Sequence, residues 1–254
     1  MRRWFPREWV RRPDRRAFNE HHTLLALAAT DIPVPRALWL DEKGHIFGVP
    51  ATIQTRLAGR ASWPEAIPAT RAAQMGDALA RIHACPPPED VPPTQMWVEP
   101  FLAHAKPPPI FRDKHPAMPT IWGALKHAGT APLEHDRVLL HGDYHAGNTL
   151  WSRGRLSGIV DWETVEAGPR GRDLGYSSMD CTITGGREMA SAMIGGYGAE
   201  PADMWFWELL AAVQAMAFYR DWQEVWRHYG LADLSLRVVR RRLDAFIDRT
   251  LRSI

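Results

Sequence analysis

Apolar and polar positions follow a helical period in two N-terminal stretches. Residues 18–29 (FNEHHTLLALAA) and 69–84 (ATRAAQMGDALARIHA) carry apolar side chains three and four positions apart, and each stretch ends before a proline-containing segment. Between them, residues 37–40 (ALWL) and 46–57 (IFGVPATIQTRL), separated by a turn at 41–44 (DEKG), predict strand, turn and strand. The pattern therefore predicts a small α+β unit followed by a longer helix.

The rest of the chain is predicted to be mainly helical. Prolines are dense between residues 85 and 119, which favours a long irregular connection over a packed element. Two short apolar runs follow, at 138–140 and 157–160, and we expect them to pair as strands with the loop 141–148 at one end. Beyond Gly171 the pattern is helical, and residues 204–229 are so rich in Trp, Phe, Leu and Met that most of them are expected in the core.

Composition and charge are those of an ordinary globular chain. The 254 residues are 45% hydrophobic and 24% charged, and 31 Lys and Arg against 29 Asp and Glu give a net charge of +2, which indicates no nucleic-acid partner. The basic run 237–242 (RVVRRR) is expected to be a solvated helix face. The sequence has two cysteines without CxxC spacing, no signal peptide and no apolar run of about 18 residues. We therefore expect a cytoplasmic protein without a membrane partner.

Two carboxylates and a carboxamide lie close together in the sequence, each near an apolar run. The segment HGDYHAGNTLW (141–151) contains Asp143 and Asn148, and SGIVDWE (157–163) adds Asp161. Phosphoryl transfer needs one carboxylate that orients an attacking hydroxyl and accepts its proton, and oxygen ligands that hold Mg²⁺ against the nucleotide phosphates. We therefore expect Asp143 to be the base, and Asn148 and Asp161 to bind Mg²⁺.

Two simpler interpretations of this segment are weaker. An isolated Asp-x-x-x-x-Asn is uninformative, because such pairs often cap turns. His141 and His145 have the i, i+4 spacing of some zinc sites, but H-E-x-x-H is absent and the glycines make a helix improbable. The Asp-x-x-x-x-Asn motif becomes specific only with the histidine and glycine before it and Asp161 after it.

The motif H-G-D-x-x-x-x-N resembles the protein-kinase catalytic loop H-R-D-x-x-x-x-N with Gly142 in place of Arg, and Asp161-Trp162 stands where the kinase metal-binding Asp-Phe does. The glycine is typical of the aminoglycoside phosphotransferase and choline-kinase branch of the kinase-like superfamily, which the chain resembles over nearly its whole length. The resemblance implies an α+β, protein-kinase-like two-lobe fold, with a truncated small N-terminal lobe at residues 1–57 and a larger, mainly helical C-terminal lobe at 58–254.

The resemblance also implies roles outside the catalytic loop. Glu20 corresponds to the helix glutamate that pairs with a cation on the nucleotide phosphates, and that cation aligns with Arg2 or Arg3. The segment 54–59 (QTRLAG) corresponds to the linker whose backbone holds adenine, which implies nucleotide contacts at Gln54, Thr55 and Leu57. His141, and Asp173 in the segment GPRGRDLG (168–175), are expected to brace the catalytic loop.

Members of that family begin with two strands and a glycine-bearing loop over the ATP phosphates, and this chain starts at the segment that follows them. Three explanations stay open: a coding start assigned too late, an unlidded nucleotide site that uses Arg2 or Arg3, and a degenerate member that binds without catalysing. Loss of two edge strands would expose a sheet edge, which we expect to permit a homodimer.

The hypothesis is a phosphotransferase that moves the γ-phosphate of ATP or GTP to a hydroxyl of a small-molecule alcohol. The alternative is a catalytically weak or inactive kinase-like nucleotide-binding or scaffold protein, and a third is a metal-dependent hydrolase that uses the same two aspartates. The acceptor stays open. An aminoglycoside would suit the acidic residues Asp180, Glu188, Glu200, Asp203, Glu208 and Glu224, whereas a sugar or a quaternary ammonium such as choline would suit Trp205, Trp207, Trp222 and Trp226.

Overall fold

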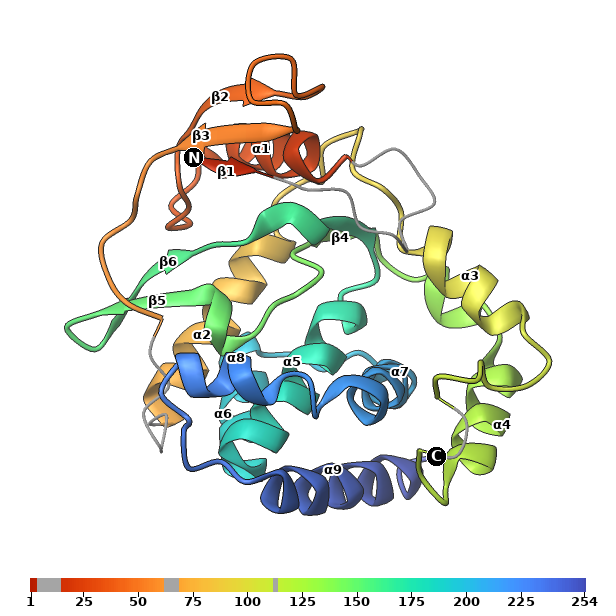
Figure 1. Cartoon of the computed structure of the whole chain (residues 1–254). Helices are drawn as coiled ribbons and strands as arrows, with labels where there is room; N and C mark the ends of the chain where they lie inside the picture. Colours follow the sequence, from red (N-terminus) through yellow and green to blue (C-terminus); the bar gives the residue numbers. More distant parts are fainter. Residues whose placement is uncertain (4–14, 62–68, 112–113) are drawn as a thin grey trace.

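A three-stranded sheet and one helix form the N-terminal part of the chain and lie on one side of a larger helical part (Figure 1). The structure, a computed structural model, describes residues 1–3, 15–61, 69–111 and 114–254. The sheet has the order β1-β3-β2 with both pairs antiparallel. Its elements and the helix beside it are β1 (Arg2–Arg3), α1 (Arg16–Leu27), β2 (Ala37–Asp41) and β3 (Ala51–Gln54).

The turn between β2 and β3 shortens the second predicted strand. The carboxylate of Asp41 accepts hydrogen bonds from the backbone amides of His45, Ile46 and Phe47 at 2.8 to 3.0 Å. Because these amides turn back toward Asp41, the chain resumes an extended conformation only at Ala51. The expected strand over 46–57 is therefore wrong in its extent, while the strand over 37–40 and the helix over 18–29 are confirmed with small shifts in their ends.

The larger part contains eight α-helices and four strands within the described residues. In chain order the elements are α2 (Ala69–His83), α3 (Gln95–Ala103), α4 (Met118–Ala128), β4 (Val138–Leu140), β5 (Thr149–Ser152), β6 (Arg155–Ile159), β7 (Glu166–Gly168), α5 (Gly171–Gly185), α6 (Arg187–Tyr197), α7 (Met204–Phe218), α8 (Gln223–His228) and α9 (Leu236–Leu251). Short 3₁₀ turns lie at Ala131–Leu133, Ala146–Asn148 and Trp162–Thr164. The helix predicted over 69–84 is confirmed.

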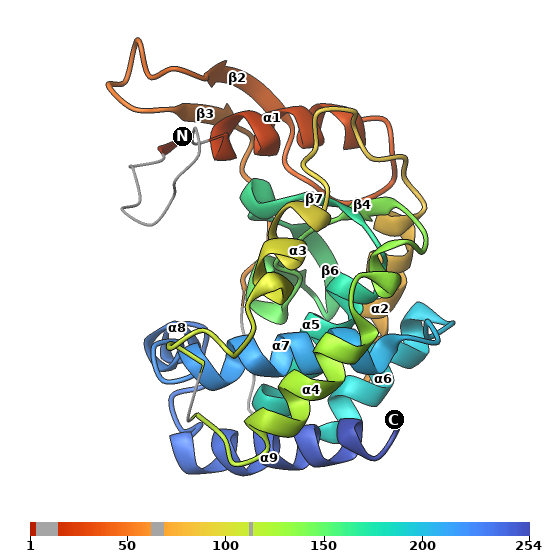
Figure 2. The ribbon, with the colours of Figure 1, turned by 90° about the vertical axis from the view of Figure 1, so that its right-hand side faces the viewer.

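The predicted pairing of residues 138–140 with 157–160 is wrong. Strand β4 pairs with β7, with Leu139 opposite Ala167, and β6 pairs with its neighbour β5, with Thr149 opposite Ile159. The reason is a reversal of the chain after β6, where Asp161 adopts φ +70° and the Trp162–Thr164 turn follows. This reversal returns residues 166–168 to the side of β4. The two strand pairs lie between the N-terminal sheet and the helices (Figures 1 and 2).

The proline-rich stretch is not wholly irregular, contrary to the expectation. It contains α3, which includes Pro100, and α4 begins at Met118 near its end. A proline at this position removes one backbone hydrogen bond. The buried side chains of Val98 and Leu102, four positions apart, hold the helix against the core despite this loss.

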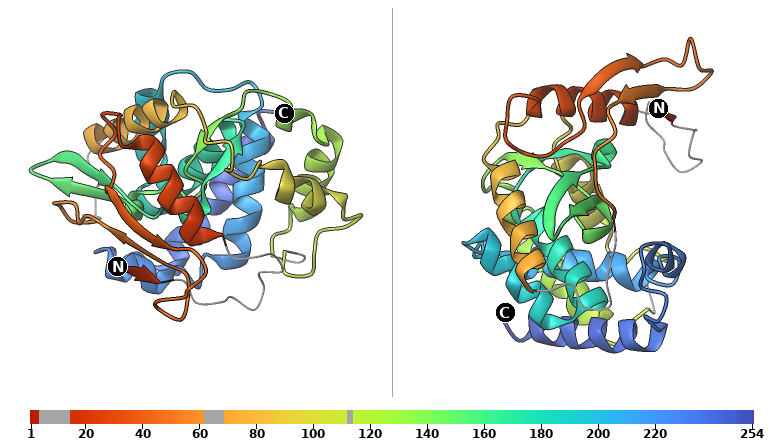
Figure 3. Two further views of the ribbon diagram at one scale, coloured as in Figure 1. Left: turned by 90° about the horizontal axis from the view of Figure 1, so that it is seen from above. Right: turned by 90° about the vertical axis from the view of Figure 1, so that its left-hand side faces the viewer.

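Helix α5 lies at the centre of the helical part and packs against α6, α7 and α9. Its buried side chains point in all directions around the helix. Figure 1 labels α6, α7 and α9 around it, and the right-hand view of Figure 3 shows α9 (dark blue) at the bottom of this group. Helices α7 and α8 divide the predicted apolar segment 204–229 in two. Helix α1, from the N-terminal part, packs on the Trp162–Thr164 turn. In the part of the chain that the structure describes, no helix has the length and apolar character that crossing a membrane would require.

The α+β class and the mainly helical larger part agree with the predicted kinase-like fold. A lobe boundary after Leu57 and a homodimer through the small sheet stay predictions. Strand β1, which comprises two residues, occupies one edge of that sheet and β2 the other.

Candidate active site

Asp173, near the start of α5, binds the backbone at the beginning of the loop from His141 to Asn148. One carboxylate oxygen of Asp173 accepts the His141 amide at 2.7 Å, and the other accepts the Gly142 amide at 2.9 Å. The same side chain lies 3.2 Å from Nε2 of His83 on α2. Burial raises the pKa of Asp173, but the hydrogen bond and charge of His83, together with the charges of His141 and Arg172, lower it by more. The bracing contact expected of Asp173 is therefore present.

His141 is a buried, neutral ring that ties the loop to the end of β6. Burial is the main cause of its lowered pKa, which favours the neutral ring. Its Nε2 lies 3.0 Å from the carbonyl of Val160, and because a carbonyl oxygen only accepts, Nε2 carries the proton and donates. Its Nδ1 lies 3.4 Å from the amide of Asp143. His141 thus braces the loop, as the sequence suggested, and also fixes the strand that leads to Asp161.

Gly142 has a backbone conformation and surroundings that only glycine suits. Its φ is +80°, and a Cβ atom built there would lie 2.0 Å from the carbonyl oxygen of Thr164. The carbonyl of Gly142 accepts a hydrogen bond from Arg172 at 3.1 Å. A side chain at this position, such as the arginine of the protein-kinase motif, would force the loop and the Thr164 turn apart.

Asp143 and Asn148 meet across the short turn that closes the loop. The amide nitrogen of Asn148 donates to the Asp143 carbonyl at 2.9 Å and lies 3.3 Å from its Oδ2. Burial raises the pKa of Asp143, but His145 and Tyr176 lower it by more, so the carboxylate is ionised at neutral pH. The Asp143 side chain is 37% exposed, which leaves it open to a ligand.

Asp161 lies directly after β6, in the left-handed region at φ +70° and ψ 57°. A non-glycine residue there costs backbone energy and is most often found at functional sites, although Asp tolerates it better than most residues. Its Oδ1 accepts from Arg2 at 2.6 Å. The strained backbone turns the carboxylate toward Arg2 and the end of the catalytic loop.

Arg2 joins the N-terminal sheet to the catalytic part of the chain. It bonds Glu20 of α1 at 2.5 Å and Asp161 at 2.6 Å, and lies 3.6 Å from Glu163. Burial of Glu20 raises its pKa to about 7, although the charge of Arg2 acts in the opposite direction. The structure therefore brings together three residues that the sequence suggested separately: Arg2, Glu20 and Asp161. The side chain of Arg3 lies outside the described residues.

A pocket of about 270 Å³ opens beside these residues. Its polar wall is made by Arg2, Gln54, Asn148 and Asp161, and its apolar wall by Ala61, Leu150 and Val160; Gly147 and Tyr229 complete the lining. Predicted nucleotide, metal and linker residues thus line one cavity. Its size and mixed lining suit part of a small ligand.

The linker residues differ in what they can offer to a ligand. Thr55 donates its amide to the Arg36 carbonyl at 3.0 Å, and its hydroxyl accepts from the Arg36 amide at 2.8 Å. Among the described residues, neither the Thr55 carbonyl nor the Leu57 amide takes part in a backbone hydrogen bond. Leu57 lies over Gly158 of β6, close to Leu150 in the wall of the pocket.

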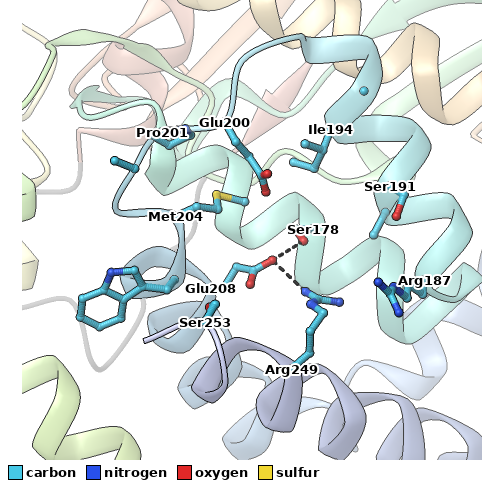
Figure 4. Close-up of a pocket in the computed structure, with 14 residues that line it drawn as sticks. Ser178, Arg187, Ser191, Ile194, Glu200, Pro201, Met204, Glu208, Arg249 and Ser253 are labelled. Carbon is cyan, nitrogen blue, oxygen red and sulfur yellow. Dashed lines mark hydrogen bonds and ion pairs between the residues drawn. The ribbon is translucent and has the colours of Figure 1, made fainter.

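The acidic residues considered for a polycationic acceptor do not gather at the catalytic loop. Asp180 faces it from α5, whereas Glu188 and Glu224 are exposed elsewhere. Glu200 and Glu208 line a second pocket of about 620 Å³ between α5, α6, α7 and α9, which shares no residue with the pocket at Asp161 (Figure 4). There Glu208 accepts hydrogen bonds from Ser178 at 2.8 Å and Arg249 at 2.9 Å.

The other five acceptor candidates, Asp203 and the four tryptophans, have contacts within the helical part. Asp203 accepts a hydrogen bond from the indole of Trp207 at 3.1 Å. Trp207 and Trp226 are buried in the core, and Trp205 and Trp222 are partly buried against it. Trp205 lines the pocket of Figure 4, and Trp222 packs against Trp226 with ring centroids 6.2 Å apart.

Two residues at the site were missed in the sequence. Glu163, two positions after Asp161, lies 3.6 Å from Arg2 and 3.8 Å from Arg16. The two acidic residues of the segment DWE (161–163) could have indicated it in the sequence. Tyr229 reaches the pocket from the segment after α8. Nothing in the local sequence distinguishes it from the aromatic residues around it.

Comparison with known proteins agrees with this fold. Residues 2–209 match the profile of the "Phosphotransferase enzyme family", and the chain belongs to that family. Its fold is that of kinase-like phosphotransferases. A protein of Ralstonia eutropha JMP134, described as a candidate aminoglycoside phosphotransferase, superposes with a TM-score of 0.60 at 18% identity over 93% of this chain and 83% of that one.

Two further structures show the same fold. Aminoglycoside phosphotransferase APH(3'')-Id of Streptomyces rimosus, in complex with ADP and streptomycin, has a TM-score of 0.58 at 20% identity, over 80% of this chain and 83% of that one. Macrolide 2'-phosphotransferase MphH of Brachybacterium faecium has a TM-score of 0.56 at 16% identity, over 96% of this chain and 81% of that one.

Proposed function

We propose that this protein transfers the γ-phosphate of ATP to a hydroxyl group of a small molecule. The observation that carries the proposal is the convergence of Asp143, Asn148 and Asp161 beside a pocket that Arg2 and Gln54 also line. Membership of the phosphotransferase enzyme family supports it. Relatives crystallised with ADP and with AMP-PNP support an adenine nucleotide as the donor.

The pocket is the proposed place of the nucleotide. The adenine ring would pack against Leu150 and Val160, and the Thr55 carbonyl and Leu57 amide would be its hydrogen-bonding partners. Arg2, held by Glu20 at 2.5 Å, would contact the phosphates. A guanidinium suits this role because its charge is permanent and its donors match phosphate oxygens.

Asn148 and Asp161 are the proposed ligands of Mg²⁺, and their donor atoms fit that ion. The amide nitrogen of Asn148 faces Asp143, which leaves its amide oxygen for a metal. Within the described ranges, no group of three or more His, Cys, Asp or Glu side chains could hold a metal alone. Mg²⁺ is commonly bound by one or two protein oxygens together with substrate phosphates. When bound, it would neutralise charge on the phosphate oxygens.

Asp143 is the proposed catalytic residue. Its ionised carboxylate would accept a hydrogen bond from the acceptor hydroxyl and direct that oxygen at the γ-phosphorus. As the new oxygen–phosphorus bond forms, the bond to the β–γ bridging oxygen breaks, and the hydroxyl proton passes to Asp143. A pKa lowered by neighbouring donors makes Asp143 a weak base, so orientation is its larger contribution.

The proposed acceptor is an alcohol, and its class stays open. The test is an ADP-release assay with Mg·ATP and a panel of aminoglycosides, macrolides, sugars and choline. Asp143→Asn should abolish turnover, and Asp31→Asn, an exposed aspartate paired with Arg81 at 2.8 Å, should leave it intact. Equal turnover of both variants would overturn the proposal.

Two other outcomes would point to the alternatives. If Mg·ATP binds and no acceptor of any class is phosphorylated, the catalytically weak nucleotide-binding protein becomes the better description. Phosphate release that depends on Asp143 and needs no acceptor would favour the hydrolase.

A further inference from the structure

The imidazole of His145 lies against the carboxylate of Asp143. Its Nε2 is 3.7 Å from Asp143 Oδ2, and its Nδ1 accepts a hydrogen bond from the Gly147 amide at 3.2 Å. Because Nδ1 accepts, the proton of the neutral ring is on Nε2, the nitrogen that faces Asp143. The charged ring carries that proton as well, but its Nδ1 is then also protonated and no longer accepts from Gly147. Both forms therefore present an N–H to the carboxylate.

The turn around His145 is shaped to the ring. A Cβ atom at Gly147 would lie 2.7 Å from the His145 Cε1 atom and 3.0 Å from its Nδ1, so a larger residue would displace the imidazole. The preceding residue, Tyr144, is fully buried and donates its hydroxyl to the Met75 carbonyl at 2.9 Å. The backbone before the ring is therefore fixed by Tyr144, and the ring occupies the space that the missing side chain of Gly147 leaves.

Helix α5 supplies the other side of the ring. Tyr176 lies edge-on to His145, with centroids 6.4 Å apart. One helical turn later is Asp180, which is 4% exposed, and its Oδ2 has no hydrogen-bond partner among the described residues. Burial lowers the pKa of His145, but the charges of Asp143 and Asp180 raise it by more, to about 9. The imidazole is therefore attracted by carboxylates on two elements.

We propose that His145 is a positioning residue for Asp143: its Nε2–H and the Asn148 side chain hold Oδ2 from the two ends of one turn, which fixes the plane of the carboxylate for the acceptor hydroxyl. The consequence for turnover rests on the proposed function. The contact itself does not, since it concerns two side chains of the resting protein.

The contact can be tested by NMR on the ¹⁵N-histidine-labelled chain. His145→Gln identifies the His145 ring signals among those of the 11 histidines. We expect a ring protonated on Nε2 whose signals move in Asp143→Ala and stay in place in the control Asp31→Ala. A neutral ring protonated on Nδ1, or signals that do not respond to Asp143→Ala, would overturn the proposal whether or not the protein has activity.

The kinetic test compares two substitutions in the full chain. Gln keeps a side-chain N–H at the distance of Nε2, whereas Phe keeps the ring and removes both nitrogens. We expect His145→Phe to lower kcat by about tenfold to a hundredfold, with the KM for Mg·ATP unchanged and with His145→Gln close to native. Native turnover in His145→Phe, or equal losses in both variants, would overturn the proposal. Absence of turnover in the native chain would count against the proposed function, and the NMR result would still decide the contact.

Discussion

Asp173→Ala tests how the catalytic loop is held. The substitution removes the acceptor of two buried backbone amides, those of His141 at 2.7 Å and Gly142 at 2.9 Å. Each buried amide without a partner costs about 1–3 kcal/mol. Because the two amides are adjacent and their effects are not strictly additive, we expect a loss of about 3–5 kcal/mol in the free energy of unfolding.

The measurement is urea denaturation followed by circular dichroism, with a thermal melt beside it. For a chain of this size about 1 kcal/mol corresponds to about 2–4 °C, so the melting temperature should fall on the order of 10 °C. The control is Asp31→Ala: this side chain is 78% exposed and pairs with Arg81, and such surface pairs contribute about 1 kcal/mol or less.

The pH dependence gives a second check on the same residue. The folded-state pKa of Asp173 lies below its usual value, so its stabilising contribution is present above that usual value and is lost as pH falls through the lowered pKa. Asp173→Ala should therefore flatten the acid limb of the stability curve. A loss no larger than that of Asp31→Ala, with the acid limb unchanged, would refute the bracing role.

Three other predictions concern separate features. Gly142→Ala should lower the free energy of unfolding by about 2–4 kcal/mol, since it adds a left-handed alanine and a clash with the Thr164 carbonyl; a urea midpoint equal to the native one would contradict this. Burial raises the pKa of Asp180 to about 6, so its ionisation destabilises the fold as pH rises from about 4 to 6. Asp180→Asn should then stabilise the chain by about 2 kcal/mol at pH 8 and by little at pH 4, and unfolding curves that show the same difference at both pH values would exclude this cause. The homodimer expected through the small sheet predicts twice the chain mass in sedimentation equilibrium at micromolar concentration, and the mass of one chain would rule it out.

The parts of the fold set by local pattern could be predicted from the sequence. Helix α2 has a regular apolar face and ends before prolines, so its bounds followed from the residues themselves. The closeness of Asp143 and Asn148 followed from their positions in one loop. Arg2 and Glu20 were placed near Asp161 by the family resemblance, since no local rule joins residues so far apart in the chain.

The wrong predictions have physical reasons that the local sequence does not carry. The pairing of β4 with β7 depends on the left-handed backbone of Asp161, a conformation that few non-glycine residues adopt. Helix α3 forms because Val98 and Leu102 are buried, which outweighs Pro100. Tyr229, after α8, and Asp180, on α5, reach the site through tertiary contacts, which are not visible in residue patterns.

We propose above that Asp161 and Asn148 hold a magnesium–nucleotide complex beside Asp143. Calorimetric titration of the 254-residue chain with Mg·ATP, repeated with Asp161→Ala and with the control Asp31→Ala, tests it most directly. We expect magnesium-dependent binding by the native chain and the control, and its loss in Asp161→Ala. Binding of equal strength in Asp161→Ala, or binding that does not depend on magnesium, would contradict it.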